Sequence, residues 1–220
     1  MIHMTLDYGA ELLAEYLGDA WDTHRAKVML GYYDACLLAL EWETRQTEHG
    51  FYTNSALYLL EGIHWNLSQA FQAYQDRLTA INGQRVLDFG GGIGTITHQL
   101  VQQGNKVYYC DINRPCREFA RWWGQKLGVP ALGYYESLNL IPPVADIVIA
   151  IDVFEHLEDL QDVLNELSAR MDIGGRIYVA PSFGFQAVYP MHHDYFADYR
   201  CWLKEAGFGS PNRGWVEKVA

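Results

Sequence analysis

The chain has 220 residues, 50% of them hydrophobic and 20% charged, and its formal net charge is −11. That length suits one domain with a sizeable core, or one domain with an appendage. The high apolar content excludes intrinsic disorder. The negative charge disfavours a nucleic-acid substrate, because an acidic protein repels phosphate backbones.

The sequence has no segment typical of a membrane or exported protein. The longest apolar run, Val144–Phe154, contains two aspartates and is too short to cross a bilayer. The first residues have neither the basic nor the apolar region of a secretory signal. The cysteines show no paired spacing, so we expect neither a zinc site nor disulfides, and a cytoplasmic location.

Residues 1–80 are expected to be helical and to precede the first strand. The apolar pattern predicts a short amphipathic helix over residues 6–17 that ends at Gly18. A second helix is predicted from Asp22, whose residue type caps helices, to Leu40.

A third helix is predicted from Thr53 or Asn54 to Leu78, because apolar residues recur there at steps of three and four. His64 is a polar member of this stripe. Two interpretations stay open for it: a hydrogen-bonded core histidine, or a side chain that reaches a substrate pocket beside Tyr52.

The centre of the sequence is a short apolar segment followed by a cluster of glycines. Residues 85–89 have the pattern of a buried strand, and helical spacing follows from Ile96 until Gly104. A glycine-rich turn between a strand and a helix brings backbone N–H groups and the positive end of the helix dipole to a ligand. The acidic residue and the four glycines of this segment are Asp88, Gly90, Gly91, Gly92 and Gly94.

The spacing of these glycines distinguishes two kinds of nucleotide site. A dinucleotide fingerprint requires glycine or alanine three residues after its second glycine, but Thr95 and Thr97 occupy the two candidate positions. The observed pattern, D-x-G-x-G-x-G from Asp88 to Gly94, resembles motif I of the class I S-adenosylmethionine-dependent methyltransferases. The resemblance implies S-adenosylmethionine as the cofactor. A nicotinamide-dependent oxidoreductase and an ordinary tight turn are the alternatives.

Residues 106–110 predict a second strand, and Asp111 follows it about 20 residues after the end of the first strand. Folds of this type place a carboxylate there for the ribose hydroxyls, because it can accept both hydrogen bonds. We therefore expect Asp111 to bind ribose, with Ile112 beside it in the cofactor site. A turn or helix-cap role for Asp111 is compatible with this, since Asn113 and Pro115 follow.

Strands and helices alternate from Arg85 onward, which predicts a mainly parallel sheet covered on both faces. A short third strand over residues 131–135 is followed by Glu136 and Ser137. In the family that motif I resembles, an acidic residue at this place contacts the adenine amino group. The resemblance implies that role for Glu136, with a surface turn as the alternative, and it places Ser137 in the same site.

Residues 145–151 are almost continuously apolar, as in a central parallel strand, and lead into Asp152-Val-Phe-Glu-His156. This run resembles the D-x-hydrophobic-E-H segment of the family, which lies beside the methionine part of the cofactor. The resemblance implies that Asp152 binds the cofactor. The carboxyl ends of parallel strands are also where ligands bind in such sheets.

A fifth strand is predicted over residues 176–180, and a loop over residues 181–191 is expected to shape the substrate pocket. Residues 192–196 are predicted to open a last helix that ends at Gly207, which resembles the last helix of many small-molecule methyltransferases. After it there is room for one short strand over residues 215–219, whereas the family sheet usually ends in a hairpin. Either the hairpin is reduced, or the chain is one part of a longer protein.

These elements predict a Rossmann-like, doubly wound α/β fold with a mainly parallel sheet and a shortened carboxyl-terminal strand region. The resemblance implies that residues 1–80 form a helical cap or lid over the substrate side. Residues 81–220 are then the S-adenosylmethionine-binding domain.

Methyl transfer mainly requires an acceptor aligned with the methyl carbon. A base is needed only for a protonated acceptor, and histidine is the usual base near neutral pH. The candidates are His192, His193 and His156, with Glu155 as an orienting carboxylate. His192 and His193 are favoured, because the resemblance places their segment opposite the methyl group. Tyr195 is expected to line the substrate pocket.

The first functional hypothesis is methyl transfer to a small-molecule acceptor, with S-adenosylhomocysteine as the product. Methylation of a protein side chain and an inactive S-adenosylmethionine-binding partner subunit are the alternatives. The acidic composition, the aromatic cap and the histidines near the end favour the first. We expect no metal, because the Asp and Asn pattern of catechol-type methyltransferases is missing, and no nucleic-acid or membrane partner. The acceptor atom and a homodimer stay open.

Overall fold

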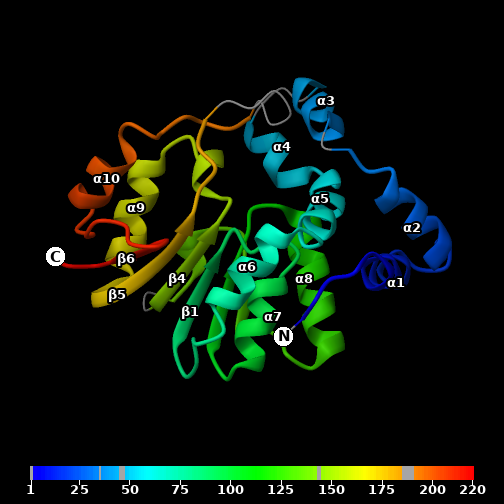
Figure 1. Ribbon diagram of the computed structural model, residues 1–220, viewed down its shortest axis with the longest axis horizontal. Coiled ribbons are helices and arrows are strands. Elements are labelled where there is room, and N and C mark those ends of the chain that lie inside the picture. The colour runs from blue at the N-terminus through cyan, green and yellow to red at the C-terminus, as the bar shows by residue number, and fades with distance from the viewer. Residues whose placement is uncertain (1, 35, 45–47, 143–144, 185–190) are drawn as a thin grey trace.

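A central sheet separates two groups of helices in the computed structural model (Figure 1), which describes residues 2–34, 36–44, 48–142, 145–184 and 191–220. The strands within these ranges are β1 (Arg85–Phe89), β2 (Lys106–Cys110), β3 (Gly133–Tyr135), β4 (Ala145–Ile151), β5 (Met171–Ala180) and β6 (Trp215–Glu217). Their spatial order is β3-β2-β1-β4-β5-β6. Neighbouring strands are parallel except β5 and β6, which are antiparallel. The predicted Rossmann-like α/β fold is confirmed.

The direction of chain progression through the sheet changes at β1. The chain moves outward from β1 through β2 to β3, then returns to β4 on the other side of β1 and continues to β5. Asp88, near the end of β1, pairs with Tyr109 of β2 and with Ile149 of β4. At such a switch point the loops after neighbouring strands diverge and leave a crevice at their carboxyl ends.

Helices cover both faces of the sheet. One face carries α6 (Gln69–Arg77), α7 (Thr95–Gln102) and α8 (Arg114–Leu127). The other carries α9 (Leu160–Ala169), α10 (Tyr199–Glu205) and the short 3₁₀ helices η1 (Leu138–Leu140) and η2 (Phe154–His156). Val86 packs with Leu100 of α7, whereas the next residue, Leu87, packs with Leu164 of α9. This alternation follows from the two-residue period of a strand.

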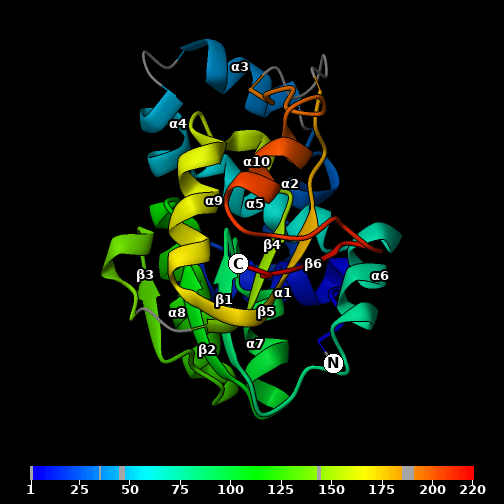
Figure 2. The same cartoon turned by 90° about the vertical axis from the view of Figure 1, so that its left-hand side faces the viewer.

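The remaining helices precede the sheet: α1 (Leu6–Leu17), α2 (Thr23–Gly31), α3 (Cys36–Thr44), α4 (Glu48–Asn54) and α5 (Leu57–Trp65). Figures 1 and 2 both show α3 and α4 beyond the carboxyl ends of the strands. Across the described ranges, each helix is too short or too polar to cross a bilayer.

The first predicted helix is confirmed, but the second is wrong in extent. Asp22 does cap α2, because its carboxylate accepts the N–H of Arg25 at 2.7 Å. However, α2 ends at Gly31. Asp34 then starts α3, since its carboxylate accepts the N–H of Cys36 at 2.9 Å. Two capped helices therefore stand where one was predicted.

The third predicted helix is also wrong in extent. Its apolar stripe spans three separate helices, α4, α5 and α6. The helical structure is interrupted after Asn54 and again after Trp65. Ser68 starts α6, because its hydroxyl accepts the N–H of Phe71 at 3.1 Å. The apolar spacing continues across both breaks, so spacing alone does not reveal them.

The strand predicted over residues 176–180 begins earlier, because β5 starts at Met171. Ala145 of β4 pairs with Met171 and Ile147 pairs with Arg176, so a register irregularity in β4 lies opposite residues 172–175, the extra length of β5. The short last strand predicted over residues 215–219 is present as β6, and it pairs antiparallel with β5.

The amino-terminal helices share a core with α8. Phe119 and Trp123 of α8 are completely buried and pack in one cluster with Leu13 of α1 and Ile63 of α5. The indole N–H of Trp123 also donates to the hydroxyl of Tyr8 at 3.3 Å. The division of the chain near residue 80 therefore does not coincide with a boundary between cores.

Candidate active site

The loop after β1 is held closely by neighbouring segments. Gly90 has a φ of +73°, and a Cβ added there would lie 2.1 Å from Cγ2 of Val153. A Cβ at Gly91 would lie 2.6 Å from the ring of Tyr109. At Gly92, which lines the main cavity, an added Cβ would meet nothing within 4 Å. The loop therefore packs against Val153 and Tyr109 on one side, and on the other side its backbone faces the cavity without covering side chains.

Asp111 is joined to this loop by its carboxylate. One oxygen accepts the N–H of Gly92 at 2.7 Å, and the other accepts the N–H of Asn113 at 2.7 Å. Burial raises the pKa of Asp111, and the two N–H groups and the charge of Arg117 oppose that rise. Each oxygen has a further lone pair, so the carboxylate can also accept two hydroxyls from a ligand. The cap of α8 is Asn113.

Asp88 lies beneath the glycine loop and is 4% exposed. Its carboxylate accepts the hydroxyl of Thr97 on α7. Burial raises the pKa of Asp88 to about 7, and the charge of Asp111 acts in the same direction. Asp88 also lines the cavity, where it links β1 to α7. Part of the protein therefore carries a neutral Asp88 at neutral pH.

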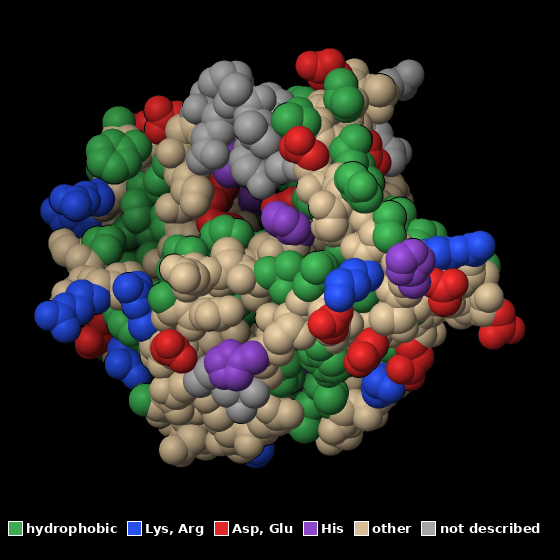
Figure 3. Space-filling model, turned by 45° about the vertical axis from the view of Figure 1, so that its right-hand side comes forward, with side chains coloured by type: hydrophobic (Ala, Val, Ile, Leu, Met, Phe, Trp, Pro, Cys, Tyr) green, Lys and Arg blue, Asp and Glu red, His purple; other side chains and the backbone are tan. Residues whose placement is uncertain are grey.

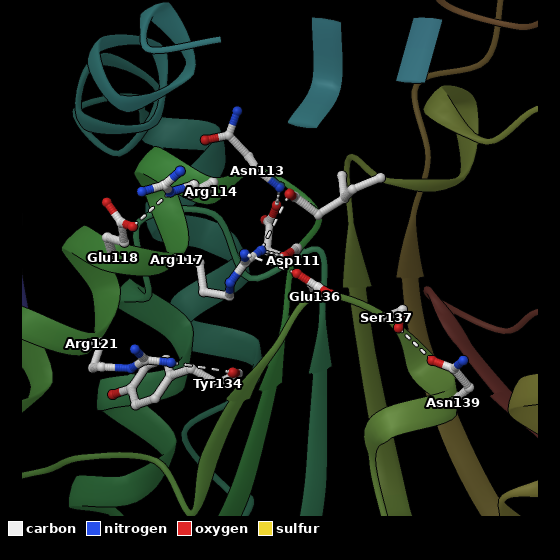
Figure 4. A network of polar contacts seen from close by, with 11 residues as sticks. Asp111, Asn113, Arg114, Arg117, Glu118, Arg121, Tyr134, Glu136, Ser137 and Asn139 are labelled. Atoms are coloured by element: carbon white, nitrogen blue, oxygen red, sulfur yellow. Dashed lines mark hydrogen bonds and ion pairs between the residues drawn. The ribbon is translucent and has the colours of Figure 1, made fainter. Parts of the chain in front are cut away.

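The side of the site next to β3 is polar and more open. Figure 4 shows the guanidinium of Arg117 between Asp111 and Glu136. It donates to the carbonyl of Asp111 at 2.7 Å and pairs with the carboxylate of Glu136 at 3.4 Å. The side chain of Glu136 is 64% exposed. Glu136, Ser137 and Ile112 all line the cavity.

Two acidic residues follow β4. Asp152 has a φ of +51°, a region that residues other than glycine rarely adopt. Its carboxylate accepts the hydroxyl of Ser182 at 2.9 Å, and that of Glu155 accepts the N–H of Ser182 at 2.8 Å. Burial, followed by the charge of Asp152, raises the pKa of Glu155 to about 8. Burial also raises the pKa of Asp152, and its hydrogen bond with Ser182 opposes that rise, so Glu155 is the member of the pair that holds a proton more readily.

Three polar rings from distant segments meet at the cavity. The hydroxyl of Tyr52 on α4 lies 3.0 Å from Nδ1 of His156 and donates to the carbonyl of Met191 at 3.2 Å. The rings of His156 and His192 are 4.6 Å apart and nearly perpendicular, at 81°. Nδ1 of His192 lies 3.2 Å from the carbonyl of Ser182. Because a carbonyl only accepts, this Nδ1 carries the proton and Nε2 is the basic atom.

Burial keeps both cavity histidines neutral. It lowers the pKa of His156 to about 3, and the charges of His192 and His193 act in the same direction. Burial also lowers the pKa of His192, although the carbonyl of Ser182 partly opposes this. Neither ring therefore adds a positive charge to the cavity at neutral pH.

The helix predicted to open at residues 192–196 is wrong, because α10 begins only at Tyr199. The N–H of His193 instead donates to the carbonyl of Glu155 at 2.8 Å, a tertiary partner in place of a helical one. The ring of His193 stacks on that of Tyr195, with centroids 5.3 Å apart. Neither His193 nor Tyr195 is among the described residues that line the cavity. The loop predicted over residues 181–191 lies only partly within the described residues.

His64 occupies neither of the two positions considered for it. It is exposed on α5, and its ring lies 5.6 Å from that of Tyr33. The cavity is lined instead by Tyr58, Glu61 and Trp65 of the same helix. These residues follow at steps of three and four and so share one face, which the sequence prediction missed.

Two further cavity residues, Asn66 and Thr95, were not predicted. Their side-chain oxygens are buried and have no hydrogen-bond partner in the described part of the protein. The amide nitrogen of Asn66 is occupied, since it donates to the carbonyl of Gly62 at 2.7 Å. Buried polar atoms are normally paired, so these two oxygens indicate a polar ligand. Thr95 begins α7, where the helix dipole favours an anionic group.

All these segments enclose one cavity of about 720 Å³, a size typical of small-molecule sites. Its described walls come from the loop after β1, the carboxyl ends of the neighbouring strands, and helices α4 to α6. Figure 3 shows a hollow in which acidic and histidine side chains gather. In the described part of the chain, no three His, Cys, Asp or Glu side chains are arranged to hold a metal ion.

Residues 87–177 match the family model of a methyltransferase domain. The chain is 33% identical over 106 residues to an uncharacterized methyltransferase of Geobacillus sp. (strain WCH70), across 46% of this chain and 48% of that protein. It is 26% identical over 106 residues to the ubiquinone biosynthesis O-methyltransferase of Photorhabdus laumondii, across 46% of this chain and 44% of that protein. The chain therefore matches about half the length of these curated relatives.

Solved structures share the fold at lower identity. Magnesium protoporphyrin IX methyltransferase from Synechocystis PCC 6803 with bound S-adenosylmethionine gives a TM-score of 0.54 at 20% identity, over 84% of this chain and 95% of that chain. The cyclopropane synthase MmaA2 from Mycobacterium tuberculosis gives a TM-score of 0.58 at 13% identity, over 66% and 63%. Residues 87–177 are therefore similar to a methyltransferase domain, and the strand order and the solved structures show that the chain has the Rossmann-like fold of such enzymes.

Proposed function

We propose that this protein transfers the methyl group of S-adenosylmethionine to a small-molecule acceptor and releases S-adenosylhomocysteine. The observation that carries the proposal is the shared cavity of about 720 Å³. Its walls include both the glycine loop with Asp111 and the polar rings of Tyr52, His156 and His192. A proposed cofactor seat and a group of candidate acceptor-binding residues thus face one cavity.

The chemistry of the walls fits each part of the cofactor. Asp111 would accept the ribose hydroxyls, and Glu136 would contact the adenine beside Ser137. The unpaired oxygens of Asn66 and Thr95 would receive the amino-acid end. When bound, S-adenosylmethionine supplies a methyl group on a positively charged sulfur, which is already activated for transfer.

The residues of the chain then position the acceptor and remove its proton. The hydroxyl of Tyr52 fixes the ring of His156, and the carbonyl of Ser182 fixes the tautomer of His192. Nε2 of His192 is therefore the atom that we assign as the proton acceptor. In-line alignment of acceptor and methyl carbon would supply most of the rate enhancement.

The position of α3 and α4 beyond the strand ends supports a small acceptor over a protein side chain (Figure 1). A protein substrate would need an open groove to admit its backbone. Here Tyr52 of α4 bonds across to the carbonyl of Met191 and to His156, which covers the cavity from the cap side.

Calorimetry with S-adenosylhomocysteine tests the cofactor assignment. We expect the Asp111→Asn variant to bind it about 10 to 100 times more weakly, because hydrogen bonds to a charged group contribute about 1.5–3 kcal/mol. Asp194→Asn is the control, since Asp194 is exposed and does not line the cavity. Equal affinity of wild type and Asp111→Asn would contradict the assignment.

A further inference from the structure

We infer that Arg117 is a positioning residue of the cofactor site, which joins the ends of β2 and β3 so that Asp111 and Glu136 bind one adenosine group. This inference rests on the proposed function, because it explains how the chain holds the groups assigned there to the ribose and the adenine. Arg117 itself is not among the described residues that line the cavity. It therefore acts through its neighbours and not by touching the ligand.

The side chain of Arg117 reaches from α8 to two strand ends. One guanidinium nitrogen, Nη1, donates to the backbone carbonyl of Asp111 at 2.7 Å and to that of Ile112 at 3.2 Å. The other, Nη2, lies 3.4 Å from the carboxylate of Glu136. Figure 4 shows all these groups around one guanidinium. The planar fork thus links the residues that follow β2 to the residue that follows β3.

The two ends of this link differ in exposure. The side chain of Arg117 is 14% exposed, whereas that of Glu136 is 64% exposed. An exposed glutamate side chain samples many rotamers unless a partner holds it. Within the described structure, that partner is Arg117. The two carbonyls fix the guanidinium, and the guanidinium in turn limits the positions of the Glu136 carboxylate beside the adenine.

The charge of Arg117 also acts on the carboxylate of Asp111. Burial raises the pKa of Asp111, and the N–H groups of Asn113 and Gly92 and the charge of Arg117 oppose that rise. The other described titratable groups that interact with this charge are acids on four neighbouring elements. They are Asp88 of β1, Tyr109 and Cys110 of β2, Cys116 of α8 and Tyr58 of α5. Arg117 thus helps Asp111 to stay ionised, the form that accepts two ribose hydroxyls.

Arg121 offers a matched comparison on the same helix. It follows Arg117 by one helical turn and is exposed. Its guanidinium donates to the carbonyl of Tyr134 at 3.5 Å and lies over the ring of that tyrosine at 5.5 Å. In the described structure, neither contact reaches Asp111 or Glu136. Arg121→Gln therefore removes the same charge from α8 without breaking the link between the strand ends.

Calorimetry with two ligands tests the positioning of Glu136. The ligands are S-adenosylhomocysteine and its analogue with hydrogen in place of the adenine amino group. In wild type we expect an affinity ratio of about 10 or more, because the analogue cannot donate to a charged carboxylate. Arg117→Gln and Arg117→Lys should each lower this ratio about threefold or more, since neither side chain has a fork that spans both strand ends.

Two further variants locate the effect. Arg121→Gln should keep the wild-type ratio. Glu136→Ala should lower the ratio to about 1, and Arg117→Gln added to it should change the ratio no further, because the two residues act through one contact. A wild-type ratio of about 1, or a wild-type ratio kept in both Arg117 variants, would overturn the inference. Failure of wild type to bind S-adenosylhomocysteine would instead contradict the proposed function itself.

The pH dependence of binding separates the charge of Arg117 from its geometry. Asp111 loses its negative charge as pH falls through its pKa, and loss of the Arg117 charge raises that pKa further. We expect the affinity of Arg117→Gln for S-adenosylhomocysteine to fall at a higher pH than that of wild type. Arg117→Lys keeps the charge and should follow wild type, although its ligand ratio is reduced. Identical pH profiles of the glutamine and lysine variants would count against the inference.

Discussion

The hydroxyl of Tyr52 lies 3.0 Å from Nδ1 of His156, although 104 residues of chain separate the two. The same hydroxyl donates to the carbonyl of Met191. One phenol thus joins the helical cap, the end of β4 and the segment after β5. The orientation of His156 in the cavity therefore depends on the cap being in place.

Removing this hydroxyl should reduce turnover more than stability. We expect Tyr52→Phe to lower the free energy of unfolding by only about 0.5–1.5 kcal/mol, the usual contribution of one hydrogen bond. The turnover number should fall about tenfold, because the ring of His156 loses its partner. Tyr32→Phe is the control, since Tyr32 is 82% exposed. Turnover equal to wild type would show that the Tyr52–His156 contact is structural only.

The adjacent histidines His192 and His193 should behave differently. His192 lines the cavity, whereas His193 stacks on Tyr195 outside it. We expect His192→Ala to lower turnover about 100-fold or more with unchanged affinity for S-adenosylhomocysteine, since general bases contribute factors of about 10² to 10⁴. His193→Ala should keep turnover within about threefold of wild type. The reverse ranking in steady-state assays would refute the assignment of the base.

Gly92 and Gly83 form a matched pair for the cavity side of the loop. Both have positive φ, +53° and +66°, and a Cβ at either would meet nothing within 4 Å. Alanine at each position should therefore cost a similar backbone strain, about 1–2 kcal/mol of stability. Only Gly92→Ala should weaken binding of S-adenosylhomocysteine, because its methyl group enters the cavity. Equal affinities of the two variants, measured by calorimetry, would place the ligand elsewhere.

Glu155 should make stability fall as pH rises. Burial raises its pKa in the folded protein to about 8, from an ordinary value of 4.5. A raised carboxyl pKa gives stability that is complete below pH 4.5 and is lost as pH rises toward 8. Glu155→Gln should flatten this part of the stability curve, measured by urea unfolding at several pH values. Glu217→Gln should keep the wild-type slope, and a Glu155→Gln curve as steep as wild type would contradict the prediction.

The sheet and the grouping of three of the predicted residues at one edge of it could be predicted because their signals are local. Asp88, Gly92 and Asp111 each lie within a few residues of a strand end, and strands that run in parallel bring their carboxyl ends to one edge. Thus the position of each residue in its own strand was enough to bring them together.

The cavity wall opposite the glycine loop could not be predicted in the same way, because distant segments build it. Trp65 and Asn66 lie at the end of a helix whose boundary the continuous apolar stripe conceals. His193 sits in a segment with helical composition, but its N–H is used by the carbonyl of Glu155. The spacing of residues in the sequence does not show whether a backbone N–H donates to a carbonyl of its own helix or to one of a distant segment.

The core shared by α8 and the amino-terminal helices has a consequence for protein engineering. A shortened expression product that starts at β1 would present Phe119 and Trp123 to water, and we expect it to aggregate. Exchange of the cap for that of another enzyme would fail for the same reason unless α8 were exchanged with it. The natural unit for recombination in this chain is therefore the cap together with α8, not the first 80 residues alone.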